Sequence, residues 1–190
     1  MEILQREIEH CLIILEKGGT LLYPTDTIWG IGCDATNPMA VERVFRIKRR
    51  DDSKSLIILL DDAGKIGDYV EEVPGPARKM VASAASPLTI IYPGAKNLAD
   101  NVMAEDRSVA IRVVKHDFCR ELIRKFGKPI VSTSANISGE NYPAGFAQIS
   151  PEIKNSVDHV VDEIFCNRDK VQPSKIIKIE KNGEITVIRG

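Results

Sequence analysis

Polar side chains that could bind a ligand are concentrated in two segments that follow apolar stretches of the chain. The first segment, 24–32, contains two threonines, an aspartate and two glycines. The second, 132–139, has five hydroxyl or amide side chains within seven residues. Small hydroxyls and backbone N–H groups at the end of a strand can form an anion-binding concavity. The alternative for both segments is a structural turn whose polar side chains bond to local backbone.

A basic segment lies between these two, with six positive and three negative side chains and a local charge of +3. Lys48 and Arg50 are two residues apart, so they diverge on a regular helix but can converge on one anion at a fraying helix end. The alternative is a solvated helix face, which is the usual role of a charge run. The segment consists of Glu42, Arg43, Arg46, Lys48, Arg49, Arg50, Asp51, Asp52 and Lys54.

The common signatures of nucleotide loops and metal centres are missing from the sequence. It contains no Walker Gly-Lys-Ser/Thr, no Gly-x-Gly-x-x-Gly, no Gly-x-Ser-x-Gly and no His-Glu-x-x-His. The four cysteines form no Cys-x-x-Cys pair, and no histidine stands at zinc-ligand spacing from one of them. We therefore expect buried, reduced thiols and no dedicated metal site. The cysteines are Cys11, Cys33, Cys119 and Cys166.

Composition limits the class of protein. The 190 residues are 43% hydrophobic and 28% charged, which suits one globular domain over 1–190 and excludes a disordered chain. A net charge of -1 argues against a uniformly basic nucleic-acid protein, and 5% aromatics argue against a stacking platform for single strands. The charged N-terminus and the lack of a long apolar run predict a cytoplasmic protein that does not contact a membrane.

Hydrophobic patterning predicts an α/β fold. Helices alternate with buried strands early in the chain, and a hairpin around Asn182-Gly183 ends it. This order favours a single-domain, twisted, open mixed sheet flanked by helices. We expect ligands at the ends of its strands. The expected helices are 2–17, one that Asn37-Pro38 opens, and 117–126; the expected strands are 20–23, 55–60, 87–92, 108–114, 129–132, 175–180 and 184–188.

Taken together and in this order, the motifs resemble the YrdC family of L-threonylcarbamoyladenylate synthases. The resemblance covers about Gly18 to Arg189. The family's diagnostic pattern is Lys-x-Arg followed by Ser-x-Asn, which Lys48, Arg50, Ser134 and Asn136 match. The other segments that carry the resemblance are Tyr-Pro-Thr-Asp-Thr-Ile-Trp-Gly-Ile-Gly-Cys-Asp-Ala at 23–35, Pro-Leu-Thr at 87–89, Val-Ala-Ile-Arg at 109–112 and Ser-Thr-Ser-Ala-Asn-Ile-Ser-Gly at 132–139.

The resemblance implies the YrdC-like fold, with a concave, positively charged sheet face, in a short form that lacks the C-terminal domain of some members. It also implies the reaction: L-threonine, bicarbonate and ATP give threonylcarbamoyl-AMP and pyrophosphate. Partner proteins then transfer the group to adenosine 37 of tRNA as N6-threonylcarbamoyladenosine, so this chain itself is expected to contact tRNA weakly or indirectly. Mg²⁺ is expected to arrive with ATP.

The family positions also imply roles for individual residues. Catalytic roles fall on Lys48, Arg50, Ser134 and Asn136; threonine binding on Thr25, Arg112, Ser132 and Ser174; and nucleotide binding on Lys48, Arg50, Ser108, Ser134, Tyr142 and Arg189. Thr27 is close enough to Thr25 to exchange roles with it. Loss of Lys48 or Arg50 is expected to stop the reaction and to leave the fold intact. Leu59 and Tyr142 depart from the usual family residues, and both departures affect substrate contacts.

Two other side chains and two other functions complete the expectations. Trp29 is expected in the pocket wall or the core, and His116 is expected to cap a helix or lie at the surface rather than act as a general base. The alternatives to the synthase are a carbamoyl-transfer domain of the same fold and a non-catalytic RNA-binding module. Pyrophosphate release that requires both threonine and bicarbonate separates the synthase from both.

Overall fold

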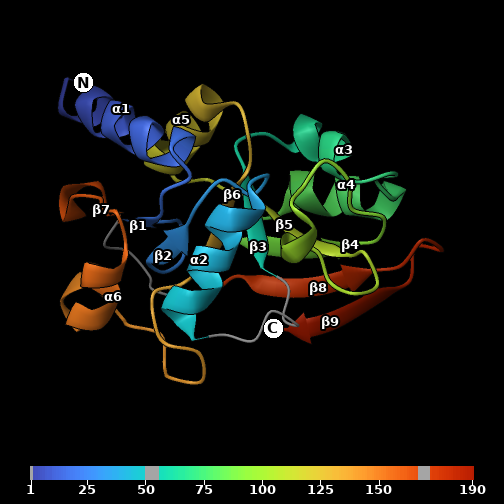
Figure 1. The fold of residues 1–190 in the computed structure, drawn as a ribbon. Helices are drawn as coiled ribbons and strands as arrows, with labels where there is room; N and C mark the ends of the chain where they lie inside the picture. Colours follow the sequence, from blue (N-terminus) through green and yellow to red (C-terminus); the bar gives the residue numbers. More distant parts are fainter. Residues whose placement is uncertain (1, 50–55, 167–171) are drawn as a thin grey trace.

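The computed structural model describes residues 2–49, 56–166 and 172–190, and within these residues nine strands form one mixed sheet (Figure 1). The strand order is β7-β1-β2-β6-β3-β5-β4-β8-β9. The pairs β1–β7, β3–β5 and β4–β8 are parallel, and the other neighbours are antiparallel. The strands are β1 Leu21–Tyr23, β2 Gly30–Gly32, β3 Ile57–Leu60, β4 Leu88–Tyr92, β5 Val109–Val113, β6 Ile130–Ser134, β7 His159–Val160, β8 Lys175–Ile179 and β9 Ile185–Arg189. The predicted mixed α/β sheet is confirmed.

Helices pack on both faces of this sheet because its strands alternate apolar side chains between the faces. Leu21 and Leu59 pack with the apolar sides of α1 and α5, which lie side by side in Figure 1, whereas Leu22 and Ile58 belong to the core on the other face. That second core also contains the buried side of α2. The helices are α1 Glu2–Glu16, α2 Pro38–Lys48, α3 Ile66–Tyr69, α4 Gly75–Ser83, α5 Asp117–Phe126 and α6 Pro151–Ser156.

Local sequence signals fix several element ends as predicted. The Asn37 side chain accepts hydrogen bonds from the backbone N–H groups of Met39 and Ala40, so it caps α2. Gly127 ends α5 in the left-handed conformation, with φ of 73°. Gly183, with φ of 85°, turns the chain between β8 and β9. Near the start of the first helix, the Ile3 side chain is 66% exposed.

The largest departure from the sequence patterns is β2, which lies inside the expected ligand loop 24–32. Its three residues pair antiparallel with β1, and Gly30 and Ile31 also pair antiparallel with β6, so the loop shrinks to 24–29. The strand β6 also continues to Ser134, two residues beyond the predicted end. Both extensions arise because each strand completes the hydrogen bonding of a neighbour, which local propensity does not encode. Periodicity also does not predict the short helices α3, α4 and α6.

One face of the sheet is only partly covered, and this opening becomes the site. In the strand register, Leu59 pairs with Ile130 on β6 and with Arg112 on β5. Ile57 and Ser132, two positions along their strands, point to the same face as Leu59 and Ile130. The helices α1 and α5 cover Leu59 and Ile130, whereas Ile57 and Ser132 line a cavity.

Among the described residues, no helix is long and apolar enough to cross a membrane. The four cysteines form no disulfide, as predicted. Burial raises the pKa of Cys33, and Cys11 and Cys119 are buried as well. Cys166 is only half-buried, so the expectation of four buried thiols is wrong for this residue.

Because β2 fits closely between β1 and β6, the stability of the fold should depend strongly on Gly32. A Cβ atom at this position would lie 2.3 Å from the Val131 carbonyl oxygen and 2.6 Å from the Tyr23 ring. Gly32→Ala should therefore lower the free energy of unfolding by roughly 1–3 kcal/mol, measured by chemical denaturation. Gly67→Ala in the short helix α3 is the control, because no atom lies within 4 Å of its added Cβ. That helical substitution should raise stability by about 0.5–1 kcal/mol. Equal effects of the two substitutions would contradict the crowding at β2.

Candidate functional site

A cavity of about 270 Å³ lies over the uncovered part of the sheet face. Ile57, Ala110 and Ser132 form part of its floor and come from three neighbouring strands. The cavity therefore lies over a face of the sheet and reaches the end of β6 at Ser134. Six of the predicted site residues line it: Arg112, Ser132, Ser134, Tyr142, Ser174 and Arg189.

Lys48 joins the end of α2 to the end of β6. Its side chain is 2% exposed, and its ammonium donates to the backbone carbonyls of Ser134, at 2.5 Å, and Asn136, at 2.6 Å. The Ser134 hydroxyl and the Asn136 amide oxygen each lie 3.4 Å from the same nitrogen. The two halves of the Lys-x-Arg and Ser-x-Asn pattern are therefore in direct contact, and the buried charge holds the turn after β6.

The chain changes direction immediately after Lys48. Arg49 caps α2 in the left-handed conformation, with φ of 47°, and its N–H donates to the Arg46 carbonyl. Its guanidinium makes an ion pair with Glu152. The helix thus ends at Lys48, the first cation of the motif. Arg50 itself lies outside the described residues.

Arg112 is a buried cation in the cavity wall. It is 4% exposed on β5, and its Nη2 lies 3.4 Å from Oδ1 of Asp26. The other carboxylate oxygen of Asp26 accepts a hydrogen bond from the Lys115 backbone N–H. The Nε of Arg112 has no hydrogen-bond partner among the described residues. A buried guanidinium with unused donors is suited to a carboxylate or phosphate ligand.

Arg189 places a second guanidinium on the same cavity. Its Nε and Nη2 donate to the Ser174 carbonyl at 3.0 and 2.8 Å. Burial lowers the pKa of Arg189, and the nearby Arg112 lowers it further. The Ser174 hydroxyl shares a hydrogen bond of 2.7 Å with Thr89. Two guanidinium groups therefore line one cavity, which creates a strong preference for anions.

The threonines of the 24–29 loop have different surroundings. The Thr25 hydroxyl donates to the Ile28 carbonyl at 2.7 Å and lies 2.9 Å from the Thr27 hydroxyl. Thr27, rather than Thr25, lines the cavity. Thr25 lines a neighbouring cavity of about 300 Å³, which also touches Thr27 and Trp29. The geometry therefore places Thr27 closer than Thr25 to a ligand beside Arg112.

Two other predicted residues lie away from the cavity lining. The Asn136 amide donates to the carbonyls of Ile137 and Glu140, at 2.9 and 2.8 Å, and so closes the 136–140 turn. Ser108 is buried at the start of β5, where its N–H donates to Asp106 at 3.0 Å. The alternative of hydroxyl and amide groups bonded to local backbone thus describes Asn136 as well as Thr25.

Three residues at the cavity were not assigned roles from the sequence. Asp26 holds Arg112, and Thr89 holds Ser174. Gly30 leaves room for Ser132, because a Cβ on this glycine would lie 3.0 Å from the Ser132 hydroxyl oxygen. Asp26 and Gly30 are in the 23–35 motif, and Thr89 is in the 87–89 motif, so their positions in those motifs were the available signal.

Trp29 and His116 flank this region. Trp29 is 3% exposed, lies in the core and also lines the cavity, as predicted. His116 precedes α5, but it is 2% exposed and its side chain does not cap the helix, so the expected capping or surface role is wrong. Burial lowers the pKa of His116, although the Asp26 carboxylate opposes this shift.

The cavity offers few ligands for a resident divalent cation. None of the described residues in its lining is acidic. Asp26, the nearby carboxylate, is already committed to Arg112 and to the Lys115 N–H. Hydroxyl oxygens such as those of Thr27 and Ser134 fit an ion that arrives with its own anionic ligands.

The buried contacts of Lys48 predict that it stabilises the fold, in contrast to the sequence-based expectation. Lys48→Met keeps the length of the side chain but removes the donor to the Ser134 and Asn136 carbonyls, of which the Ser134 carbonyl keeps the Asn136 N–H. The free energy of unfolding should fall by about 2 kcal/mol or more, measured by urea denaturation. Arg46→Met on the same helix removes an exposed pair with Glu42 and should cost at most about 0.5 kcal/mol. Similar losses for the two variants would argue against the role of Lys48.

The burial of His116 predicts a pH dependence of stability. Its pKa in the folded state lies below the ordinary value of 6.5, so the unfolded chain binds more protons as the pH falls through and below this value. Stability should consequently decrease on acidification. One such group changes the free energy of unfolding by on the order of 1 kcal/mol per pH unit at most. His116→Gln removes this contribution, so between pH 7.5 and 5 the free energy of unfolding should fall less in the variant than in the wild type. Identical slopes would show that His116 does not titrate as described.

Comparisons with known proteins agree with this architecture. The Sua5/YciO/YrdC family model, described as "Telomere recombination", matches residues 13–190. A threonylcarbamoyl-AMP synthase of Pseudoalteromonas translucida is 35% identical over 184 residues, which are 95% of this chain and 97% of that protein. The protein of the same name from Idiomarina loihiensis is 33% identical and covers 85% of this chain and 87% of its own length.

Solved structures share the fold. Escherichia coli YciO superimposes with a TM-score of 0.84 at 24% identity, over 97% of this chain and 89% of that one. Sua5 of P. abyssi, complexed with L-threonine, has a TM-score of 0.83 at 24% identity, over 90% of this chain and 50% of that one. The family model covers nearly the whole sequence, and the relatives match it over most of their length. The chain therefore belongs to the Sua5/YciO/YrdC family.

Proposed function

We propose that this protein is an L-threonylcarbamoyladenylate synthase. The observation that carries the proposal is the pair of guanidinium groups, Arg112 and Arg189, on one cavity whose described lining contains no acidic residue. The substrates of this reaction bring together a carboxylate, bicarbonate and a triphosphate, so the site must attract and hold several anions. Relatives of similar length at 33–35% identity carry the name threonylcarbamoyl-AMP synthase.

The reaction needs positioned charges more than a protein nucleophile. The threonine amine attacks bicarbonate, a C–N bond forms, and water leaves to give the N-carboxylate. A carboxylate oxygen then attacks the α-phosphorus of ATP, and pyrophosphate leaves with the electron pair of the broken P–O bond. Because both nucleophiles come from the substrates, the protein contributes orientation and stabilisation of negative charge.

Arg112 is suited to hold the carboxylate of threonine. Its free Nε and its planar donors can form two parallel hydrogen bonds with a carboxylate, and Asp26 restrains it from the other side. Hydroxyl groups of Thr27 and Ser132 lie on the same cavity and can bond to the threonine side chain or amine. Ser174 is held in place by Thr89 and Arg189 and completes this end of the site.

The nucleotide is expected to lie beside Arg189 and Tyr142. Tyr142 is 45% exposed, so its ring is available to a base or ribose at the mouth of the cavity. Ser134 lines the cavity next to the turn that Lys48 stabilises, which suits a phosphate near the ammonium and the backbone of this turn. Asn136 acts through the shape of the turn. We assign Arg50 to the phosphates. We assign no substrate contact to Ser108.

Mg²⁺ belongs to this proposal as a companion of ATP. When bound, it neutralises phosphate charge as pyrophosphate departs. The described cavity residues supply hydroxyl oxygens and no carboxylate cage, which matches an ion held mainly by phosphates and water. We further propose that the protein acts in the cytoplasm and that partner proteins transfer the product to adenosine 37 of tRNA.

The decisive experiment measures pyrophosphate release from ATP with the purified chain. Release should require both L-threonine and bicarbonate, and the product should have the mass of threonylcarbamoyl-AMP. Release of pyrophosphate from ATP without threonine, with carbamoyl phosphate as the second substrate, would favour the carbamoyl-transfer alternative. Absence of release together with tight tRNA binding would favour the RNA-binding module.

The guanidinium geometry of Arg112 predicts a selective effect on threonine. Arg112→Lys keeps the charge but loses the planar fork, so the KM for threonine should rise roughly tenfold or more while the KM for ATP changes little. Steady-state pyrophosphate assays with each substrate varied in turn measure this difference. Arg124→Lys on α5 is the matched control, since this exposed arginine forms an ion pair with its helix neighbour Glu121 and does not line the cavity. A parallel rise of both KM values would assign Arg112 a general structural role.

A further inference from the structure

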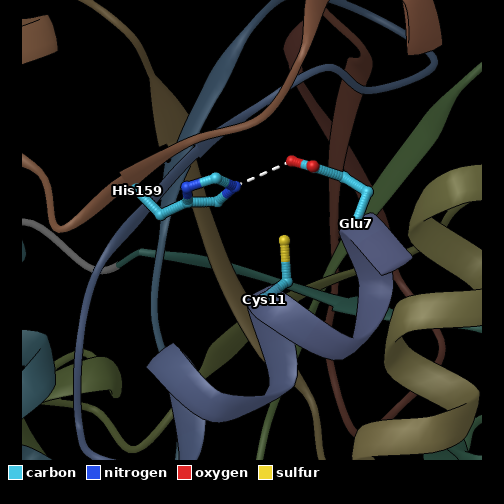
Figure 2. Close-up of side chains that lie close together, drawn as sticks. All are labelled: Glu7, Cys11 and His159. Atoms are coloured by element: carbon cyan, nitrogen blue, oxygen red, sulfur yellow. Dashed lines mark hydrogen bonds and ion pairs between the residues drawn. The ribbon is translucent and has the colours of Figure 1, made fainter. Parts of the chain in front are cut away.

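A second group of polar side chains lies at the β7 edge of the sheet, outside the cavity. Glu7 and Cys11 are four residues apart on α1, and His159 begins β7. A carboxylate oxygen of Glu7, the Cys11 sulfur and a ring nitrogen of His159 all lie within 4.8 Å of one another. Figure 2 shows the sulfur pointing toward the space between the Glu7 carboxylate and the His159 ring.

The fold holds these three groups in place before any ligand binds. Spacing of four residues puts Glu7 and Cys11 on one face of α1. His159 pairs in register with Leu21 of β1, and the preceding Asp158 accepts hydrogen bonds from the N–H and hydroxyl of Thr20. Both elements that carry the cluster are therefore anchored to β1 or to the core beneath it.

The donor set has the chemistry of a zinc site. Thiolate, imidazole and carboxylate are the three side-chain ligands that zinc-class cations bind in proteins. Bond lengths of about 2.0–2.3 Å place tetrahedral ligand atoms roughly 3.3–3.8 Å apart, so small side-chain rotations convert the observed cluster into such a site. The Nε2 of His159 and Oε1 of Glu7 are already 2.7 Å apart. A second imidazole, that of His10, lies with its ring centre 4.2 Å from the His159 ring centre.

We propose that Glu7, Cys11 and His159 bind one zinc-class divalent cation, which fastens α1 to β7. On binding, the Cys11 thiol releases its proton to solvent as the metal–sulfur bond forms. The Glu7–His159 hydrogen bond is replaced by one coordinate bond from each residue. Three protein ligands leave one position for water. This metal site is independent of the proposed synthase activity, since none of its three residues lines the cavity.

Cobalt(II) is the probe that identifies the ligands. The metal-free full chain, without nucleotide or magnesium, should bind one equivalent of Co²⁺ and develop thiolate-to-cobalt absorption in the near ultraviolet. Zn²⁺ should displace the cobalt and raise the melting temperature of the protein. Cys11→Ser should lose the charge-transfer absorption. It should also weaken Zn²⁺ binding by more than the roughly 10- to 100-fold that loss of an outer-shell partner costs. Cys166→Ser, the matched thiol control, should bind both metals as the wild type does.

His159→Gln keeps the test decisive if Cys11→Ser does not fold. Glutamine retains an N–H donor for Glu7 but is a poor zinc ligand, so this variant should fold and lose the zinc-induced rise in melting temperature. An unchanged zinc response in His159→Gln, or thiolate absorption that persists in Cys11→Ser, would overturn the proposal. Absence of thiolate absorption in the wild type would also overturn it, and the cluster would then be a Glu7–His159 hydrogen bond only.

Discussion

The buried ammonium of Lys48 is the interaction on which the candidate site depends. It is removed from water at the end of α2, and its cost of burial is offset by the carbonyls of Ser134 and Asn136. Through these contacts one charge joins a helix end to a strand end 86 residues later. The turn after β6 therefore has a fixed shape on the side of the cavity where we place the phosphates. A cation that organises the binding loop can serve binding as much as one that touches the ligand.

The electrostatics of the cavity also depend on a small number of charged side chains. Arg112 is buried beside a single carboxylate, and Arg189 donates to a backbone carbonyl rather than to an acid. Because water is largely excluded at Arg112, an incoming anion interacts with it more strongly than it would with a surface arginine. Asp26 compensates the charge of Arg112 before substrate binds. One buried cation, one exposed cation and one carboxylate thus give a site that is stable when empty and still attracts anions.

The position of this site is set by incomplete helix coverage. The helices α1 and α5 pack over Leu59 and Ile130, which lie on the same sheet face as the cavity floor. On this face, Ser132 and Arg112 stand in place of apolar residues, and the helices stop covering the sheet at these positions. Gly30, on the adjacent β2, has no side chain beside the Ser132 hydroxyl, so a ligand in the cavity can reach this hydroxyl. Fold and site are therefore two consequences of one pattern of side chains on the central strands.

The sequence by itself determined the features that depend on neighbouring residues. The period of α1, the Asn37 cap, the Gly127 helix end and the Asn182-Gly183 turn are local signals, and the motif correctly grouped Lys48 with Ser134 and Asn136. Only the tertiary structure decided that the Lys48 and Asn136 side chains bond to backbone, that Thr27 rather than Thr25 faces the cavity, and that Gly30–Gly32 forms a strand between β1 and β6. It also placed His159 beside Glu7, 152 residues away. These outcomes depend on partners distant in the chain, and local propensity carries no information about which strand or side chain will be adjacent after folding.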